Sequence, residues 1–196
     1  ATEYLNYEDT KFSKSRGTGV FGDQARETGI EADLWRFYLL YMRPESQDTA
    51  FSWDDFMLKV NSELLANLGN FINRALSFCA ANFGGVIPAM NLNDDDVTFL
   101  EEVQKELREW DKLMTDVKLR DAVRSVLALS RLGNQYMQAQ QPWVGVKGDA
   151  AQKARAGTVI GVACNVAFHL AIVLHPIMPE MSHRIREQCG HPDLPR

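Results

Sequence analysis

The sequence predicts a mainly α protein: a helical bundle from residue 44 onward, preceded by a short segment of different texture. Three observations predict this fold. Apolar residues recur at helical spacing, capping residues and prolines punctuate the chain, and strand-like alternation is confined to residues 3–7. The 196 residues are 45% hydrophobic and 24% charged, an ordinary globular mixture that argues against a disordered or fibrous chain.

We expect three parts along the chain. Residues 1–43 hold a short strand, a glycine-rich polar loop and one helix, and resemble the end of a larger upstream region. Residues 44–190 form the helical domain, and residues 191–196 form a tail. The cysteines are odd in number and widely spaced, and no basic–apolar signal segment opens the chain, so we expect reduced thiols and a cytoplasmic protein. They are Cys79, Cys164 and Cys189.

The first predicted helix has a start signal and a stop signal. Thr28 and Glu31 have the spacing of a capping box, and the apolar run of residues 34–41 follows them. Pro44 ends this helix near Met42, because the residue before a proline is biased away from helical dihedrals.

A second, much longer helix is predicted over residues 53–83. Ser52 and Asp55 resemble a cap, with the carboxylate shortened from the usual glutamate, and apolar residues then recur at helical spacing as far as the pair of glycines at 84–85. This length is well above the usual ~11–12 residues, so we expect a bend near Gly69.

Two more helices follow. Asn93 and the three acidic residues after it begin a helix that runs to about Thr115, because the helix dipole favours acids at its N-terminus. The next helix covers about residues 116–139 and is broken by Pro142. Asp149 is the expected cap of the apolar helix that comes next.

The alternative interpretation of that apolar helix is a membrane-spanning helix. Its run over residues 158–174 is only 17 residues long, against the ~20 that a spanning helix needs, and it contains Asn165 and His169 before Pro176 stops it. We therefore interpret it as a helix buried in the middle of the bundle. A last short helix is expected over residues 179–189.

The front loop is the first candidate functional site. Lys11, Lys14 and Arg16 lie among small hydroxyl and glycine residues, a composition that suits anion binding; from charge alone, an ordinary basic turn stays equally open. Residues 17–22 spell GxGxxG. A dinucleotide-binding motif must follow a buried strand and open a helix, whereas polar residues precede this one, so we discard that interpretation.

Two further candidates lie in the bundle. Asn70 and Arg74 are four residues apart, hence on one helix face, and are side chains suited to hydrogen-bonding base edges, although such a pair is commonplace on helix surfaces. Trp143 follows Pro142 at a helix end, where it could stack on an unpaired base; the alternative is a core tryptophan. We expect no metal site, because the spacings of the C-terminal His and Cys residues match no zinc pattern: His175, His183, Cys189 and His191.

The loop Lys11–Ser15, KFSKS, resembles the KMSKS signature of class I aminoacyl-tRNA synthetases. The stretches YLNYEDTKFSKSRGTGVFG, DLWRFYLLYMRPESQD, NSELLANLGNFINR and QPW follow in the order found in methionyl-tRNA synthetases of the eukaryotic cytosolic type. The resemblance extends from Tyr4 to the segment HPIMPEMS, which is nearly the whole chain.

The resemblance implies roles for the loop. Lys14 would stabilise the ATP phosphates and the departing pyrophosphate, and Lys11 would support it, because positive charge favours oxygens that gain charge in the transition state. Phe12, Ser13 and Ser15 complete the ATP and pyrophosphate loop. Phe12 stands where the family consensus has methionine, and both residues are apolar.

The resemblance also implies roles in the bundle, which becomes an anticodon-binding domain. Asn70 and Arg74 would hydrogen-bond base edges, and Trp143 would stack on an unstacked base of the CAU anticodon. The implied activity is that of a methionine–tRNA ligase using Mg-bound ATP, with tRNA(Met), methionine and ATP as partners. A multi-synthetase complex is a candidate larger assembly, and no membrane is implied. The 196 residues contain no HIGH-like motif, so we expect this part alone to be inactive.

Taken alone, a net charge of −5 would disfavour nucleic acid as a partner, but this charge is not spread evenly along the chain. Residues 91–116 hold nine acidic and three basic residues, a net charge of −6, which leaves the rest of the chain at +1. We expect this acidic helix to lie away from bound RNA. Two alternatives remain: a helical protein–protein interaction module without RNA binding, and an autonomous nucleotide-binding enzyme built on the GxGxxG stretch.

Overall fold

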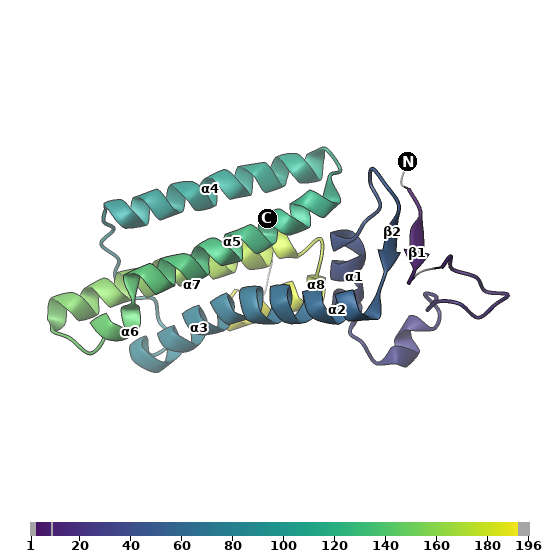
Figure 1. Ribbon diagram of the computed structural model, residues 1–196. Coiled ribbons are helices and arrows are strands. Elements are labelled where there is room, and N and C mark those ends of the chain that lie inside the picture. The colour runs from purple at the N-terminus through teal and green to yellow at the C-terminus, as the bar shows by residue number, and fades with distance from the viewer. Residues whose placement is uncertain (1–2, 9, 192–196) are drawn as a thin grey trace.

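The computed structural model describes residues 3–8 and 10–191. Helices make up most of it, which confirms the predicted mainly α class (Figure 1). The elements are β1 (Leu5–Tyr7), the 3-10 helix η1 (Ala25–Thr28), α1 (Ala32–Tyr41), β2 (Thr49–Phe51), α2 (Trp53–Lys59), the π-helix η2 (Val60–Gly69), α3 (Asn70–Phe83), α4 (Asp94–Thr115), α5 (Leu119–Gln140), α6 (Pro142–Gly145), α7 (Ala150–Leu174) and α8 (Pro179–Gln188). Of the predicted tail, residues 192–196 lie outside the described residues.

Three predicted helix starts are confirmed by their hydrogen bonds. Ser52 caps α2, since its side chain accepts from the backbone N–H of Asp55 at 3.5 Å. Asn93 begins α4 through a complete capping box with Asp96, and Asp149 caps α7 with the residue three positions later. Each box satisfies backbone N–H groups that have no partner inside the helix.

The long helix over residues 53–83 is continuous, but its hydrogen-bond pattern changes twice. The middle third, η2, is π-helical, and it gives way to α3 directly after Gly69, where the sequence predicts a bend. A Cβ at Gly69 would lie 3.0 Å from the carbonyl oxygen of Leu64. Glycine therefore permits the close approach of backbone turns at this junction.

The predicted capping role of Thr28 is wrong. Thr28 ends η1, and its hydroxyl donates to the carbonyl of Ala25 at 2.6 Å. Gly29 then takes a left-handed conformation with φ of 71°, which separates η1 from the next helix. α1 starts only at Ala32, with Glu31 as an N-cap that makes no side-chain capping bond.

The expectation that strand structure is confined to the front is also wrong. β1 pairs in parallel with β2, with Leu5 opposite Thr49 and Tyr7 opposite Phe51. β2 has only three residues and no alternating pattern of its own, so its pairing depends on a partner more than forty residues away. This pair crosses the proposed boundary between residues 43 and 44, which stays a prediction.

The start of α5 differs in detail from the prediction, whereas its end agrees with it. α5 starts at Leu119 rather than near residue 116, because Val117 adopts a positive φ of 59° that interrupts helical geometry. Pro142 ends α5 as expected, and it also begins the short helix α6.

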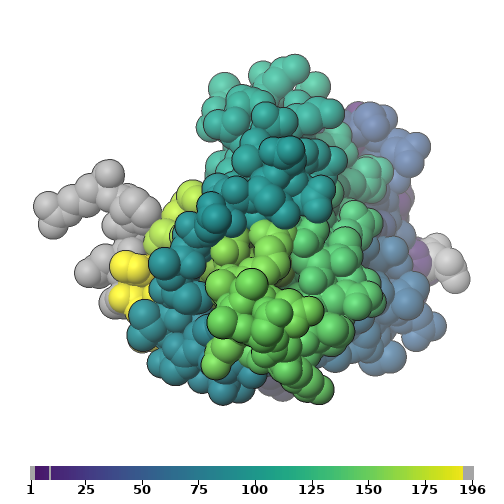
Figure 2. Space-filling model, turned by 90° about the vertical axis from the view of Figure 1, so that its left-hand side faces the viewer, coloured from purple at the N-terminus to yellow at the C-terminus, as the bar shows by residue number. Residues whose placement is uncertain are grey.

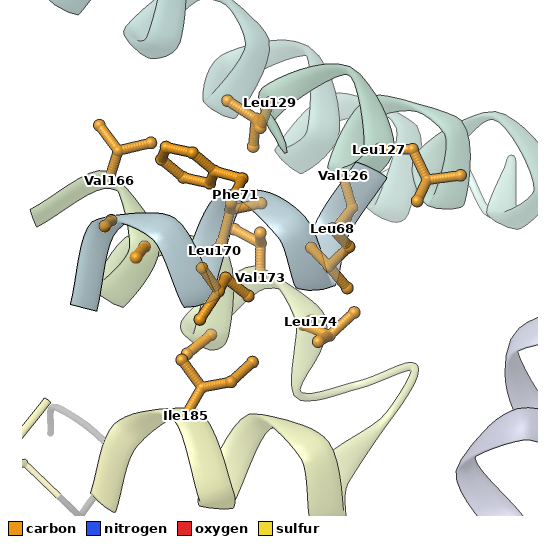
Figure 3. Packing of buried hydrophobic residues seen from close by; sticks show 14 of the residues in the cluster. Leu68, Phe71, Val126, Leu127, Leu129, Val166, Leu170, Val173, Leu174 and Ile185 are labelled. Carbon is orange, nitrogen blue, oxygen red and sulfur yellow. The ribbon is translucent and has the colours of Figure 1, made fainter. Parts of the chain in front are cut away.

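α7 is the central helix of the bundle. It packs against α3, α5, α6 and α8. Figure 3 shows side chains of α3, α5 and α8 gathered around Val166, Leu170 and Val173. By length and composition it is apolar enough to cross a membrane, yet 78% of its most apolar window is buried inside the protein. This is the placement expected of a core helix, and it leaves little of the apolar face of α7 for a partner protein.

A buried ion pair joins α4, α5 and α7. The Asp96 carboxylate is completely buried and accepts hydrogen bonds from Arg155 on α7 and from the Tyr136 hydroxyl on α5. Burial alone would raise the pKa of Asp96, but these hydrogen bonds and that of the Asn93 backbone N–H outweigh it, so the pKa of Asp96 is lowered. Asp96 is therefore a carboxylate at neutral pH.

The cysteines are free thiols, in agreement with their predicted reduced state. Cys79 and Cys164 are buried, and burial raises the pKa of Cys164 to about 12. A thiol with so high a pKa is almost entirely protonated at neutral pH, so it acts as a small apolar core residue.

Candidate nucleic-acid interface

Asn70, Arg74 and Trp143 come together on one surface. Asn70 is the first residue of α3, and Arg74 lies one turn further along the same helix. Trp143 approaches from α6, so that the Arg74 guanidinium carbon lies 5.1 Å from the centroid of the indole ring. This distance is that of a cation–π contact, which orients both planar groups.

The local turn explains how Trp143 reaches this place. Gln141 adopts a left-handed conformation with φ of 44°, which redirects the chain at the end of α5. Pro142 is buried as the first residue of α6, where its missing N–H is not needed. Trp143 is only half-buried, so it is not the fully enclosed core tryptophan of the alternative interpretation.

Sequence reasoning missed a fourth member of this surface, Asn134 on α5. Its Oδ1 accepts a hydrogen bond from Asn70 Nδ2 at 2.9 Å and another from Arg74 Nη1 at 3.4 Å. Nothing in the local sequence singles Asn134 out, because its partners Asn70 and Arg74 lie sixty or more residues earlier in the chain. We call these four residues the polar patch: Asn70, Arg74, Asn134 and Trp143.

The polar patch stands on buried polar groups that are themselves hydrogen-bonded. Asn134 Nδ2 donates to the carbonyl oxygens of Asn67, at 3.0 Å, and Ser130, at 3.2 Å. Below them, Ser130 Oγ lies 3.0 Å from Asn67 Oδ1, and Asn67 Nδ2 donates to the carbonyl of Leu127 at 3.1 Å. A satisfied buried network of this kind holds its members in one arrangement.

Beside the polar patch lies a shallow depression of about 520 Å³ between η2–α3 and α5. Eight of its ten lining residues carry amide, guanidinium or carboxylate groups that can hydrogen-bond a ligand. The lining residues are Ser62, Glu63, Ala66, Asn67, Asn70, Arg74, Arg131, Asn134, Gln135 and Gln138.

The loop of residues 11–15, which we call the signature loop, forms a tight turn with the residues up to Thr18. Ser13 and Thr18 exchange two backbone hydrogen bonds, of 3.0 and 2.9 Å, and Gly17 closes the turn with φ of 63°. Lys11 and Lys14 are exposed on it. The Lys14 ammonium lies 5.4 Å from the centroid of a phenylalanine ring, a contact that leaves its three N–H donors available to an anion.

Phe12 anchors this turn to the body of the protein. Its ring centroid lies 5.2 Å from that of Tyr7 and 5.8 Å from that of Phe21. Gly19 has φ of 114°, and a Cβ there would collide with the Phe12 ring. The GxGxxG stretch thus lies between a turn and η1 rather than between a strand and a helix, in agreement with our rejection of the dinucleotide interpretation.

The signature loop and α6, which carries Trp143 of the polar patch, lie at opposite ends of the molecule (Figure 1). The loop extends beyond β1 at one end, and α6 lies at the other. Within residues 3–8 and 10–191, no group of three or more His, Cys, Asp and Glu side chains is arranged to hold a metal ion. The two places therefore meet different ligands, or distant parts of one large ligand.

Comparisons with known proteins agree over the whole chain. Residues 1–76 match the family model of class I tRNA synthetases (M), and residues 87–194 match the anticodon binding domain of methionyl tRNA ligase. The cytoplasmic methionine–tRNA ligase of Caenorhabditis elegans is 69% identical over 100% of this chain and 21% of its own length. The human cytoplasmic enzyme is 58% identical over 98% of this chain and 21% of its own length.

A solved structure agrees as well. Mycobacterium tuberculosis methionyl-tRNA synthetase in complex with methionyl-adenylate superposes with a TM-score of 0.87 at 28% identity, over 95% of this chain and 37% of that one. The chain spans about a fifth of the length of the curated relatives named above. It belongs to the methionyl-tRNA ligase family, of which it carries class I synthetase residues and the anticodon-binding domain.

Proposed function

We propose that this chain is the part of a cytoplasmic methionine–tRNA ligase that carries the KMSKS-type loop and reads the CAU anticodon of tRNA(Met). The observation that carries the proposal is the convergence of Asn70, Arg74 and Trp143, from two distant stretches of sequence, on one hydrogen-bonded surface. The membership of the chain in the ligase family supports it.

At the polar patch, recognition combines stacking with hydrogen bonding. An unpaired anticodon base stacks on Trp143, because single-stranded bases present an aromatic face that a tryptophan ring matches. Asn70 offers an amide donor and acceptor, and Arg74 a planar fork of donors, to base edges. Asn134 holds both side chains by its Oδ1, so little side-chain freedom remains to be lost when RNA binds.

At the signature loop, Lys14 stabilises the charge that develops on the departing pyrophosphate during methionine activation by ATP, and Lys11 assists it. Exposed ammonium groups on a glycine-containing turn suit this task, because phosphate oxygens can approach both the side chains and the backbone. Ser13 and Ser15 add hydroxyl donors. The loop itself offers no carboxylate, so Mg²⁺ belongs with the ATP rather than with these residues.

The partners of the whole enzyme are tRNA(Met), methionine and ATP, and we place it in the cytoplasm with the relatives whose names say so. A multi-synthetase complex remains a candidate larger assembly. The alternative, a protein-interaction module without RNA binding, predicts that size-exclusion chromatography is unaffected by tRNA; the present proposal predicts a shift to a larger species.

Binding of anticodon stem-loops to the 196-residue chain tests the proposal. The chain should bind a CAU loop more tightly than a scrambled loop of the same length. Trp143→Ala should weaken CAU binding by about 5- to 150-fold, since base–aromatic stacking contributes roughly 1–3 kcal/mol. Val144→Ala, at the exposed neighbouring position on α6, is the matched control and should change little. Equal affinity for CAU and scrambled loops would refute the proposal.

A further inference from the structure

The depression beside the polar patch has a second rim, formed by an ion pair. Arg131 on α5 donates from Nη1 to Glu63 Oε2 on η2 at 3.0 Å, and the two side chains are 47% and 23% exposed. Both residues line the same depression as Asn70 and Arg74. A cation thus lines the same depression as the residues proposed to read bases.

This ion pair is easily exchanged for another anion. Its one described hydrogen bond uses a single N–H of a guanidinium that has five. Because the Arg131 side chain is nearly half exposed, water and salt weaken its attraction to Glu63. Glu63 also keeps a second donor, because Asn67 Nδ2 lies 3.3 Å from the same Oε2. Departure of Arg131 therefore leaves the Glu63 carboxylate hydrogen-bonded.

We propose that Arg131 binds a backbone phosphate of the RNA strand whose bases occupy the polar patch, and that Glu63 holds the guanidinium at the rim until the phosphate replaces its carboxylate. A phosphodiester offers two oxygens to the planar fork, against the one carboxylate oxygen that Arg131 now contacts. The proposal rests on the proposed function, because it needs a strand at the patch.

Glu63 has a second consequence for the same strand. When Arg131 turns to a phosphate, the carboxylate stays beside it and repels the backbone. The net gain from the phosphate contact is then small, so binding depends chiefly on base contacts, which carry the sequence information. The Glu63–Arg131 pair thus favours selective binding over tight non-specific binding.

The chain supplies a matched control for this pair. Arg124, on the same helix, forms a similar exposed ion pair with Asp121 at 3.3 Å, and it is not among the residues that line the depression. A general effect of positive charge on RNA affinity would affect both arginines, whereas a phosphate contact at the rim involves Arg131 alone.

The test is the salt dependence of CAU stem-loop binding by the 196-residue chain. Each phosphate contact contributes about 0.7 to 0.9 to the slope of log affinity against log salt concentration. Arg131→Gln should lose this contribution, so from 50 to 200 mM salt the wild type loses about threefold more affinity than the variant. Arg131→Lys keeps the charge and should retain the slope, and Arg124→Gln should retain it too.

Glu63→Gln completes the test, since the amide oxygen can still accept from Asn67. It should bind CAU and scrambled loops more tightly and by the same factor, with the slope unchanged. The proposal fails if Arg131→Gln keeps the wild-type slope, or if Arg124→Gln lowers the slope equally. The wild-type preference for CAU is measured in parallel: its absence overturns the proposed function, whereas its presence with an unchanged Arg131→Gln slope overturns this inference alone.

Discussion

Replacing Asn134 by alanine tests whether the positions of the base-contacting side chains matter for RNA binding. The variant keeps Asn70, Arg74 and Trp143 and removes only the residue that holds the first two in place. The variant removes the Oδ1 that accepts from Asn70 at 2.9 Å and from Arg74 at 3.4 Å. Asn70 and Arg74 then both lose this shared hydrogen-bond acceptor, and Arg74 keeps its contact with the Trp143 ring. Immobilising a flexible side chain on binding costs about 0.5–1.5 kcal/mol, so CAU binding should weaken by about 1–3 kcal/mol, or roughly 5- to 150-fold.

The same substitution should affect the fold only moderately. Asn134 Nδ2 donates to two backbone carbonyls at 3.0 and 3.2 Å, and the net contribution of a hydrogen bond is about 0.5–1.5 kcal/mol. The free energy of unfolding should therefore fall by roughly 1–3 kcal/mol, which a urea titration measures alongside the binding assay.

Fluorescence anisotropy with a labelled CAU stem-loop and a scrambled loop measures the functional effect. Asn82→Ala is a suitable control, because Asn82 lies on the same helix as Asn70 and its side chain donates locally, to the carbonyl of Phe78. The pre-organisation argument is refuted if Asn134→Ala, still folded, binds CAU as tightly as the wild type. It is equally refuted if the loss is the same for both loops.

Three further predictions concern the core and the loop. Gly133→Ala should destabilise the fold by about 1–3 kcal/mol in urea, because a Cβ at the buried Gly133 would collide with the Phe71 ring. Asp96→Asn should lower the free energy of unfolding by about 3 kcal/mol at pH 7, the lower end for a buried pair because Arg155 stays 30% exposed. Since the pKa of Asp96 is lowered in the fold, the difference between the two proteins is present above the unfolded pKa of about 3.9 and should shrink as pH falls through the folded pKa. Urea titrations at pH 3 and pH 7 measure this change. Lys14→Ala, in a methionine–tRNA ligase that carries this segment, should lower kcat for ATP–pyrophosphate exchange by about 10²- to 10³-fold, and an unchanged kcat would contradict its role.

The parts of the fold that are predictable from sequence are those whose chemistry is local. Asn93 and Asp149 mark helix starts because the hydrogen-bond partner of each is only three residues away. β2 escapes prediction because its three residues gain their hydrogen bonds from β1, far away in the sequence. The capping box predicted for Thr28 is wrong although its spacing to Glu31 is correct, because Gly29 between them adopts a left-handed conformation.

In the candidate site, too, the local features could be predicted from the sequence and the long-range ones could not. The spacing of Asn70 and Arg74 places them on one helix face, and Pro142 fixes Trp143 at a helix end, so each could be identified separately. Their meeting is a property of tertiary packing, which brings Asn134 of α5 to Asn70 and Arg74 and brings Trp143 of α6 to Arg74. Without the family resemblance, an Asn and an Arg four residues apart would have remained an ordinary helix surface.

The arrangement of charge explains how a chain of net charge −5 suits an RNA ligand. The acids that dominate residues 91–116 lie on and around α4, which packs along α5 and forms the ridge at the top of the view in Figure 2. The polar patch lies on the other side of α5, towards α3 (Figure 1). A helix is about 10 Å across, and the Debye length at physiological ionic strength is about 8 Å. With α5 between them, most of the acids on α4 influence an RNA strand at the patch less than the charges of the patch itself, so the net charge of −5 does not exclude RNA binding there.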